Sequence, residues 1–291
     1  MTGPSPFDGA WKPKQILCAG LPFPAEELAD AVTRAGASLT VAGTTIGVLG
    51  QLFQLHAEPA ADPKIPRAFA AARTRAGATV TDADVDAIGR HVCVVYVESE
   101  PLVDDEDALA CAQRSLALAV ELLDVGALGV KCESSGTVHG ADGWRLFLAE
   151  LRSGLAELRA GSEDGRSRFF AAMIRAWVRW PVPADDDVLT TVGMHLLGRP
   201  EVAVARTDVD GDDDATQLLA AFAHYSCAEV APADLADGHH FRLTDDAPRY
   251  VLRREWVSPF PEYDVSFDPW GRWRLVRERD AAGGVVGGPI G

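Results

Sequence analysis

The chain has 291 residues and a formal net charge of −16 at pH 7, because 43 Asp and Glu oppose 27 Lys and Arg. Such a charge disfavours nucleic acid as a partner, since the phosphate backbone would be repelled. No apolar run approaches the roughly 20 residues that span a bilayer, and residues 1–14 lack the basic segment and apolar core of a secretory signal. We therefore expect a cytoplasmic protein that does not enter membranes.

Strands and helices alternate at the start of the chain. A strand is predicted over residues 15–19 and a helix over 26–35, with Gly36 at the position of a left-handed C-cap. Strands at 38–48 and 51–56 and a helix at 65–76 follow. The opening is therefore β-α-β-β-α in outline.

The strongest predicted strand is the run HVCVVYVE over 91–98, whose β-branched and apolar residues indicate a central position in a sheet. Asp104 or Asp105 can cap the next helix, and Gly126 ends it. A strand over 128–132 follows.

A further helix is predicted from a cap at Asp142 to Gly161. The polar segment GSEDGRSR, 161–168, marks a boundary between two halves. Residues 169–180 fit a helix or a strand, ended by Pro181 and Pro183.

The rest of the chain has short predicted elements. A hairpin turns around Gly198 between 189–197 and 201–205, and a helix covers 216–229. Short strands follow at 240–243, 250–256, 263–267 and 273–277.

These elements predict an α+β fold, with mixed or antiparallel sheets covered by amphipathic helices. Two similar-sized halves are expected, an N-terminal α/β half over 1–161 and a C-terminal α+β half over 162–280. Residues 281–291 are too rich in glycine to order themselves and form a flexible tail.

The stretch GVKCESSGTVHG, 129–140, contains the first candidate site, because it brings a thiol, a carboxylate and an imidazole together. If 128–133 is a strand, Cys132 shares its face with the apolar Val130 and is packed inward. A nucleophilic Cys132 would need His139 as its base, with Glu133 nearby. The spacing permits that contact and does not impose it.

Other polar residues provide weaker signals. His195 and Glu201 are further candidates for catalysis beside the same loop. The five cysteines form no CxxC pair, and neither HExxH nor HxH occurs, so we expect no disulfide framework, no metal and no cofactor. Free backbone N–H groups near Asp142 could hold an anion, although an aspartate cap would occupy them.

Arginine and tryptophan are concentrated in two segments, and such residues are common both at interface hot spots and in cores. The candidates for partner binding are Arg175, Trp177, Arg179, Trp270 and Arg272.

Three segments together, GALGVKCESSGTVHGADGW, TTVGMHLLGRPEVAV and GHHFRL followed by FDPWGRWRL, resemble the uncharacterised bacterial family DUF4261. The resemblance spans most of residues 90–276 and includes His91. It implies a fold unit and no particular chemistry.

The sequence leaves three functions open. The first, which the lack of a catalytic motif favours, is an acidic module that binds a basic protein, in the manner of an immunity protein; whether the chain is an enzyme stays open. The second is an enzyme or small-ligand binder that uses the loop from Glu133 to His139. The third is a structural subunit of an assembly. Neither the partner nor the oligomeric state follows from the sequence.

Overall fold

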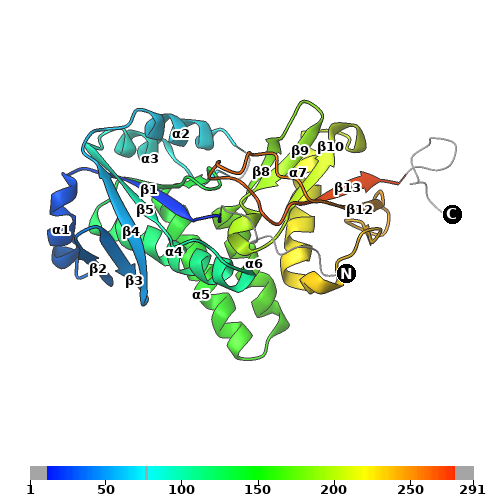
Figure 1. The fold of residues 1–291 in the computed structure, drawn as a ribbon, viewed down its shortest axis with the longest axis horizontal. Helices are drawn as coiled ribbons and strands as arrows, with labels where there is room; N and C mark the ends of the chain where they lie inside the picture. The colour runs from blue at the N-terminus through cyan, green and yellow to red at the C-terminus, as the bar shows by residue number, and fades with distance from the viewer. Residues whose placement is uncertain (1–11, 76–77, 279–291) are drawn as a thin grey trace.

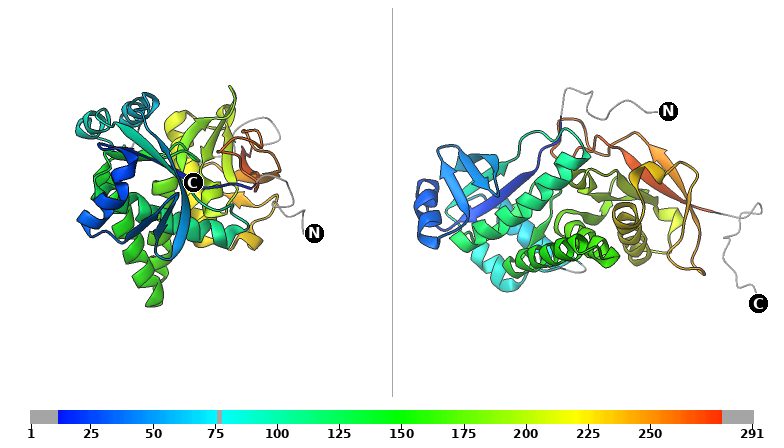
Figure 2. Two further views of the ribbon diagram at one scale, coloured as in Figure 1. Left: turned by 60° about the vertical axis from the view of Figure 1, so that its left-hand side comes forward. Right: turned by 90° about the horizontal axis from the view of Figure 1, so that it is seen from below.

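The computed structural model describes residues 12–75 and 78–278, and it has the predicted α+β class. Two open sheets lie along the long axis of the molecule (Figures 1 and 2). The described residues contain seven α-helices, which are α1 (Leu28–Ala35), α2 (Lys64–Arg73), α3 (Asp82–Ile88), α4 (Asp105–Val125), α5 (Ala141–Arg159), α6 (Glu163–Trp177) and α7 (Asp212–His224).

The first sheet has seven antiparallel strands in the order β2-β3-β4-β5-β1-β6-β7. They are β1 (Ile16–Leu21), β2 (Leu39–Ala42), β3 (Thr45–Val48), β4 (Gln51–Glu58), β5 (Cys93–Glu98), β6 (Gly129–Cys132) and β7 (Val138–His139).

Both faces of the first sheet are covered. Leu17, Ala19 and Leu21 of β1 pack with α4 and α5, whereas Cys18 points to the opposite face and packs with residues of α2 and α3. Successive side chains of a strand point to opposite faces, so a strand buried on both sides is apolar throughout. This explains why β1 and β5 read as continuous apolar runs.

The second sheet has six strands in the order β11-β12-β13-β10-β9-β8 and is mixed, because β10 and β13 are parallel. Its strands are β8 (Arg179–Pro183), β9 (Val188–Val192), β10 (Glu201–Ala205), β11 (His240–Phe241), β12 (Tyr250–Glu255) and β13 (Arg272–Arg277). Side chains such as Val204, Leu252 and Leu275 pack against Leu218 and Phe222 of α7.

Several local predictions are confirmed. Gly36 and Gly126 end α1 and α4 with φ of 62° and 113°, which is the left-handed conformation expected of C-cap glycines. The Asp104 side chain caps α4 by accepting from the Asp107 N–H at 2.8 Å. The predicted pairing of 189–197 with 201–205 forms between β9 and β10, although residues 194–197 form a 3-10 helix instead of extending the strand.

Other local predictions are wrong. Residues 38–48 form two strands, because Gly43 turns the chain with φ of 59°. Residues 263–267 form turns, and α3 was not predicted. Its signal was the capping box between Thr81 and Asp84, in a segment with too few apolar residues to show a helical period.

The N-terminus of α5 is capped from outside its own segment. Its N-cap is Gly140, which has no side chain, and Asp142 lies exposed in the first turn, so the predicted cap is wrong. Instead, Asp84 of α3 accepts from the Ala141 N–H at 3.2 Å. A carboxylate therefore already occupies one of the backbone N–H donors that were predicted to hold an anion.

Of the predicted boundary at 161–168, residues 161–162 lie in the turn between α5 and α6, whereas 163–168 begin α6. The two helices pack so closely that a Cβ on Gly165 would lie 2.4 Å from the Leu158 backbone nitrogen. The core formed by α4, α5 and α6 extends into the turns η2 (Met194–Leu197) and η4 (Tyr225–Glu229). The two-half division stays a prediction, and the predicted tail at 281–291 lies outside the described residues.

Candidate functional site

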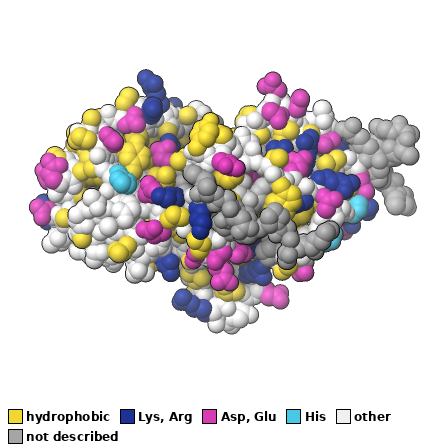
Figure 3. Space-filling model, in the orientation of Figure 1, with side chains coloured by type: hydrophobic (Ala, Val, Ile, Leu, Met, Phe, Trp, Pro, Cys, Tyr) yellow, Lys and Arg dark blue, Asp and Glu magenta, His cyan; other side chains and the backbone are white. Residues whose placement is uncertain are grey.

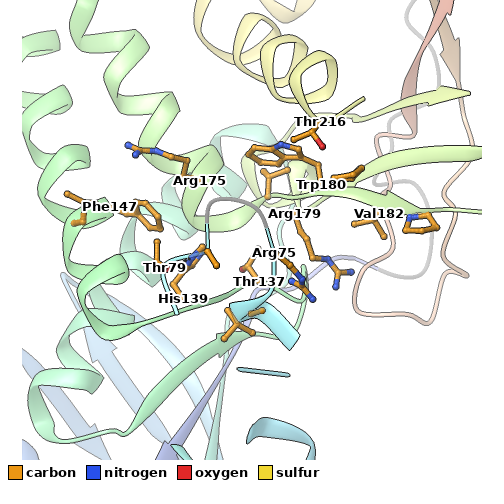
Figure 4. A pocket seen from close by; sticks show the side chains of 17 residues that line it. Arg75, Thr79, Thr137, His139, Phe147, Arg175, Arg179, Trp180, Val182 and Thr216 are labelled. Atoms are coloured by element: carbon orange, nitrogen blue, oxygen red, sulfur yellow. Dashed lines mark hydrogen bonds between the residues drawn. The ribbon is translucent and has the colours of Figure 1, made fainter. Parts of the chain in front are cut away.

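A cavity of about 690 Å³ lies between β7 and β8, the edge strands of the two sheets (Figure 4). Its walls also include the C-terminal end of α2, the first half of α5, the C-terminal end of α6 and Thr216 of α7. Ligand sites are commonly cavities of about 300–1,000 Å³ at the meeting points of structural units. This cavity is therefore the principal candidate site of the described residues.

β8 forms one wall of the cavity, and its two prolines are compatible with its position at the edge of the second sheet. Pro181 and Pro183 have no backbone N–H, so they are tolerated where no further strand pairs. Trp180, which directly precedes Pro181, is half-buried and packs against both hydrophobic cores. β8 therefore places the Trp180 ring beside the cavity, while its prolines disfavour pairing of its free edge with another strand.

Arg179 begins β8 and lies over the turn between β6 and β7. A Cβ at Gly136, which has φ of 67°, would be 3.1 Å from Arg179 Nη1, so glycine makes room for the guanidinium. The Arg179 Nε is buried and has no hydrogen-bond partner among the described residues. Burial, and then the charge of Arg75, lower the pKa of Arg179.

Arg75 approaches the same space from the segment after α2. Its side chain is exposed, and partial burial lowers its pKa. Figure 4 shows the guanidinium groups of Arg75 and Arg179 close together at one end of the cavity. Within the described residues, neither arginine has a carboxylate within 4 Å.

His139 of β7 is held as a neutral imidazole at the cavity wall. Its Nε2 lies 3.1 Å from the carbonyl oxygen of Ala176, and its Nδ1 lies 3.2 Å from Thr79 Oγ1. A carbonyl only accepts, so Nε2 carries the proton and Nδ1 accepts from the threonine hydroxyl. Burial lowers the His139 pKa to about 4, although the backbone carbonyl of Ala176 opposes that shift.

The other end of the cavity is apolar. Phe147 is buried, and its ring lies edge-on to His139 with centroids 4.9 Å apart. Val178 and Trp180 extend this surface. Arg175 also lines the cavity, but its guanidinium forms an ion pair with Glu150 and lies 5.2 Å from the Phe147 ring centroid.

The lining differs in charge from the rest of the protein. None of the described residues that line the cavity is Asp or Glu, although the chain has 43 of them. By contrast, acidic and basic side chains are interspersed on the molecular face seen in Figure 3. The cavity therefore concentrates positive charge beside an apolar wall.

Cys132 and His139 do not form a nucleophile and base. Cys132 is fully buried in the core beside α4, α5 and α6, and burial raises its pKa. Both ring nitrogens of His139 have other partners. A thiolate attacking group needs a lowered pKa and a base in reach, and neither condition is met.

Glu133 lies beside Lys131, with its Oε2 2.6 Å from Lys131 Nζ. It is the first residue after β6 and begins the turn towards β7. Glu133 does not line the cavity. Of the predicted loop, the cavity is lined by Thr137, Val138 and His139.

His195 and Glu201 lie in a separate buried cluster. Glu201 Oε1 accepts from the Gly193 N–H at 2.8 Å and lies 3.1 Å from His195 Nδ1, and Oε2 accepts from the Thr191 hydroxyl at 2.6 Å. Asp268 accepts from the Glu201 N–H at 2.9 Å. Burial and the charge of Glu201 raise the Asp268 pKa well above its usual range, whereas its backbone N–H donors act in the opposite direction.

The candidates for partner binding separate in the structure. Trp177 is fully buried and Trp270 is 8% exposed, so both belong to the core. The prediction that these two side chains contact a partner directly is therefore wrong. Arg272 forms an ion pair with Glu255, Nε to Oε2 2.6 Å. Arg175 and Arg179 line the cavity instead of an outer surface.

Residues 12–75 and 78–278 hold no group of three or more His, Cys, Asp or Glu side chains placed to share a metal ion. No helix in the same residues is both long and apolar enough to cross a bilayer.

The chain matches no family model, no curated protein and no solved structure with which it was compared. The resemblance to DUF4261 stays a prediction.

Sequence analysis missed Arg75, Thr79 and Trp180 as site residues. Arg75 follows a modest helix, and nothing near it in the sequence indicates that β8 lies opposite. A weak signal was available at Trp180-Pro-Val-Pro183, since alternate prolines indicate an edge strand. The residues meet only through the packing of α2, β7 and β8.

Proposed function

We propose that the protein binds a small organic anion in the cavity between β7 and β8. The anionic group lies between Arg75 and Arg179, and an apolar or aromatic body lies against Phe147, Val178 and Trp180. One observation supports this most strongly: two arginines without carboxylate partners in the described residues face a cavity whose described lining holds no acidic side chain.

Electrostatics favour an anion at this place. Two like charges held near each other in a partly buried space repel, which is consistent with the contribution of Arg75 to the lowered pKa of Arg179. An anion between them relieves that repulsion and can accept from the guanidinium N–H groups that line the cavity. Guanidinium groups are suited to this because their fork of N–H donors matches carboxylate and phosphate oxygens.

The test uses 2-naphthoate as probe and 2-naphthamide as its uncharged counterpart, with titration calorimetry on the full chain. We expect the carboxylate to bind about tenfold or more tightly than the amide, because a hydrogen bond to a charged group contributes about 1.5–3 kcal/mol. In Arg75→Gln and Arg179→Gln the preference should shrink, and the double variant should lose it.

Arg34→Gln is the matched control, because Arg34 is exposed on α1 and the substitution removes the same charge far from the cavity. Its preference should equal that of the parent chain. Binding of 2-naphthoate that survives in the Arg75→Gln/Arg179→Gln double variant would contradict the proposal.

A second candidate function is recognition of a basic protein, which the net charge of −16 favours. The connection between β12 and β13 also exposes large apolar side chains, with Trp256 60% and Tyr263 83% exposed. Exposed aromatic residues of this kind are common anchors at interfaces.

Binding of the products of neighbouring genes, at low and at physiological salt, tests this candidate. Trp256→Ala/Tyr263→Ala should weaken such a complex, while Leu158→Ala, a partly exposed residue on α5, should not. No complex at either salt concentration would contradict it.

A further inference from the structure

The charge of the cavity exceeds what one carboxylate can neutralise. Of the three arginines in the lining, Arg175 already has Glu150 as its partner. Arg75 and Arg179 remain, and His139 is neutral at pH 7 because its pKa is about 4. With no Asp or Glu in the described lining, the local charge is that of two guanidinium groups.

The donors are arranged for an acceptor with several oxygens. Gly136 positions the Arg179 guanidinium against the turn between β6 and β7, and Arg75 approaches it from α2 (Figure 4). The buried Arg179 Nε lacks a partner in the described part of the chain. A carboxylate has two oxygens in one plane, whereas a phosphate monoester has three terminal oxygens that two guanidinium forks can share.

We infer that the ligand of this cavity is a phosphate monoester bound as its dianion between Arg75 and Arg179, with an aromatic or apolar ester group against Phe147 and Trp180. The inference rests on the proposed function and makes it more specific. It commits to a charge of −2 on the anionic group, which distinguishes it from carboxylates and sulfate esters.

The closing experiment compares 2-naphthyl phosphate with 2-naphthyl sulfate by calorimetry at pH 7.5. The two have the same aromatic body and tetrahedral head group and differ by one charge. We expect the phosphate to bind about tenfold or more tightly, because the second charge meets a second guanidinium in a partly buried space. Equal affinities overturn the inference and leave the proposed function standing.

Lowering the pH gives an independent readout. The second pKa of a phosphate monoester is about 6, so at pH 5 most of the ligand is a monoanion and its apparent affinity should fall about fivefold. The sulfate ester stays a monoanion, and its affinity should not change. His139, faced by the cations Arg75, Arg175 and Arg179, remains neutral at pH 5. A parallel fall for both esters would overturn the inference.

Variants connect the charge preference to the two arginines. Arg75→Gln and Arg179→Gln should each reduce the phosphate-to-sulfate ratio several-fold, and Arg179→Lys should keep more of it than Arg179→Gln because the charge is retained. Arg34→Gln should leave the ratio unchanged. If neither ester nor 2-naphthoate binds the parent chain, the proposed function itself fails.

Discussion

The cluster around Glu201 and the cavity around Arg179 combine histidine with charged side chains in opposite ways. Glu201 is 2% exposed, and both its oxygens accept from groups on the turn and strand beside it. Arg179 has no carboxylate partner within the described residues and lines the cavity. A charge whose hydrogen bonds are complete stabilises the fold, whereas one whose donors face a cavity is available to a ligand.

The histidines show the same contrast. His195 is fully buried beside a carboxylate, while His139 lies at the cavity wall with a backbone carbonyl and a threonine hydroxyl as partners. The residue type alone therefore does not indicate function. Its partners and its access to solvent do.

Removing the Glu201 carboxylate should have the largest effect on stability. In Glu201→Ala the Gly193 N–H, the Thr191 hydroxyl and His195 Nδ1 lose their shared partner, so we expect a loss of about 3–5 kcal/mol in the free energy of unfolding. Urea denaturation measures it. Glu262→Ala, at an exposed position, should cost less than about 0.5 kcal/mol.

Glu201→Gln keeps one acceptor oxygen and should lose less than Glu201→Ala. Affinity for 2-naphthoate should remain that of the parent chain wherever the variant is folded, because Glu201 does not line the cavity. A similar loss in Glu262→Ala would show that the buried network is not what stabilises this region.

The next largest effect is expected on lowering the pH, because the His139 pKa makes the free energy of unfolding depend on pH. Its folded pKa of about 4 lies below the usual 6.5, so the unfolded chain binds a proton first as the pH falls. The stabilisation is complete above pH 6.5 and is lost progressively towards pH 4, by about 2 kcal/mol at pH 5. His139→Gln cannot titrate, and its unfolding free energy should fall less between pH 7 and pH 5. Parallel falls in both chains would contradict this assignment.

A third test separates backbone strain from the position of Arg179. Gly136→Ala and Gly43→Ala both place a side chain on a left-handed backbone, at φ of 67° and 59°, and should each cost about 1–2 kcal/mol. Gly136→Ala also crowds the Arg179 guanidinium, whereas Gly43→Ala does not, because the space around Gly43 is open. We expect weaker 2-naphthoate binding by calorimetry in Gly136→Ala alone. Equal affinities in the two variants would contradict the role of Gly136.

The smallest effect is expected at Glu133. Glu133→Gln removes a half-buried ion pair with Lys131, which should cost about 0.5–1 kcal/mol by urea denaturation. Ligand affinity should not change, because this carboxylate lies outside the cavity. A marked loss of 2-naphthoate binding would show that Glu133 takes part in ligand binding.

In the candidate loop, the orientation of Cys132 could be predicted from the sequence, whereas the surroundings of His139 could not. The period of two along β6 correctly turned Cys132 inward, because adjacent strand residues point to opposite faces. The same pattern could not distinguish the surroundings of His139 from those of His195. That difference depends on α2, α6 and β8, which are distant in the sequence from β7.

By itself the sequence determined the α+β class, the strands β1 and β5, the central position of β5, and the ends of α1 and α4 at Gly36 and Gly126. These features depend on residues within a few positions of one another, and alternation, helical period and caps record such local relations. Only the tertiary structure decided that Asp84 caps α5 and that Arg75 and Arg179 meet across a cavity without acidic side chains in its described lining. Those contacts join segments whose mutual approach depends on how whole helices and sheets pack, and no local pattern encodes it.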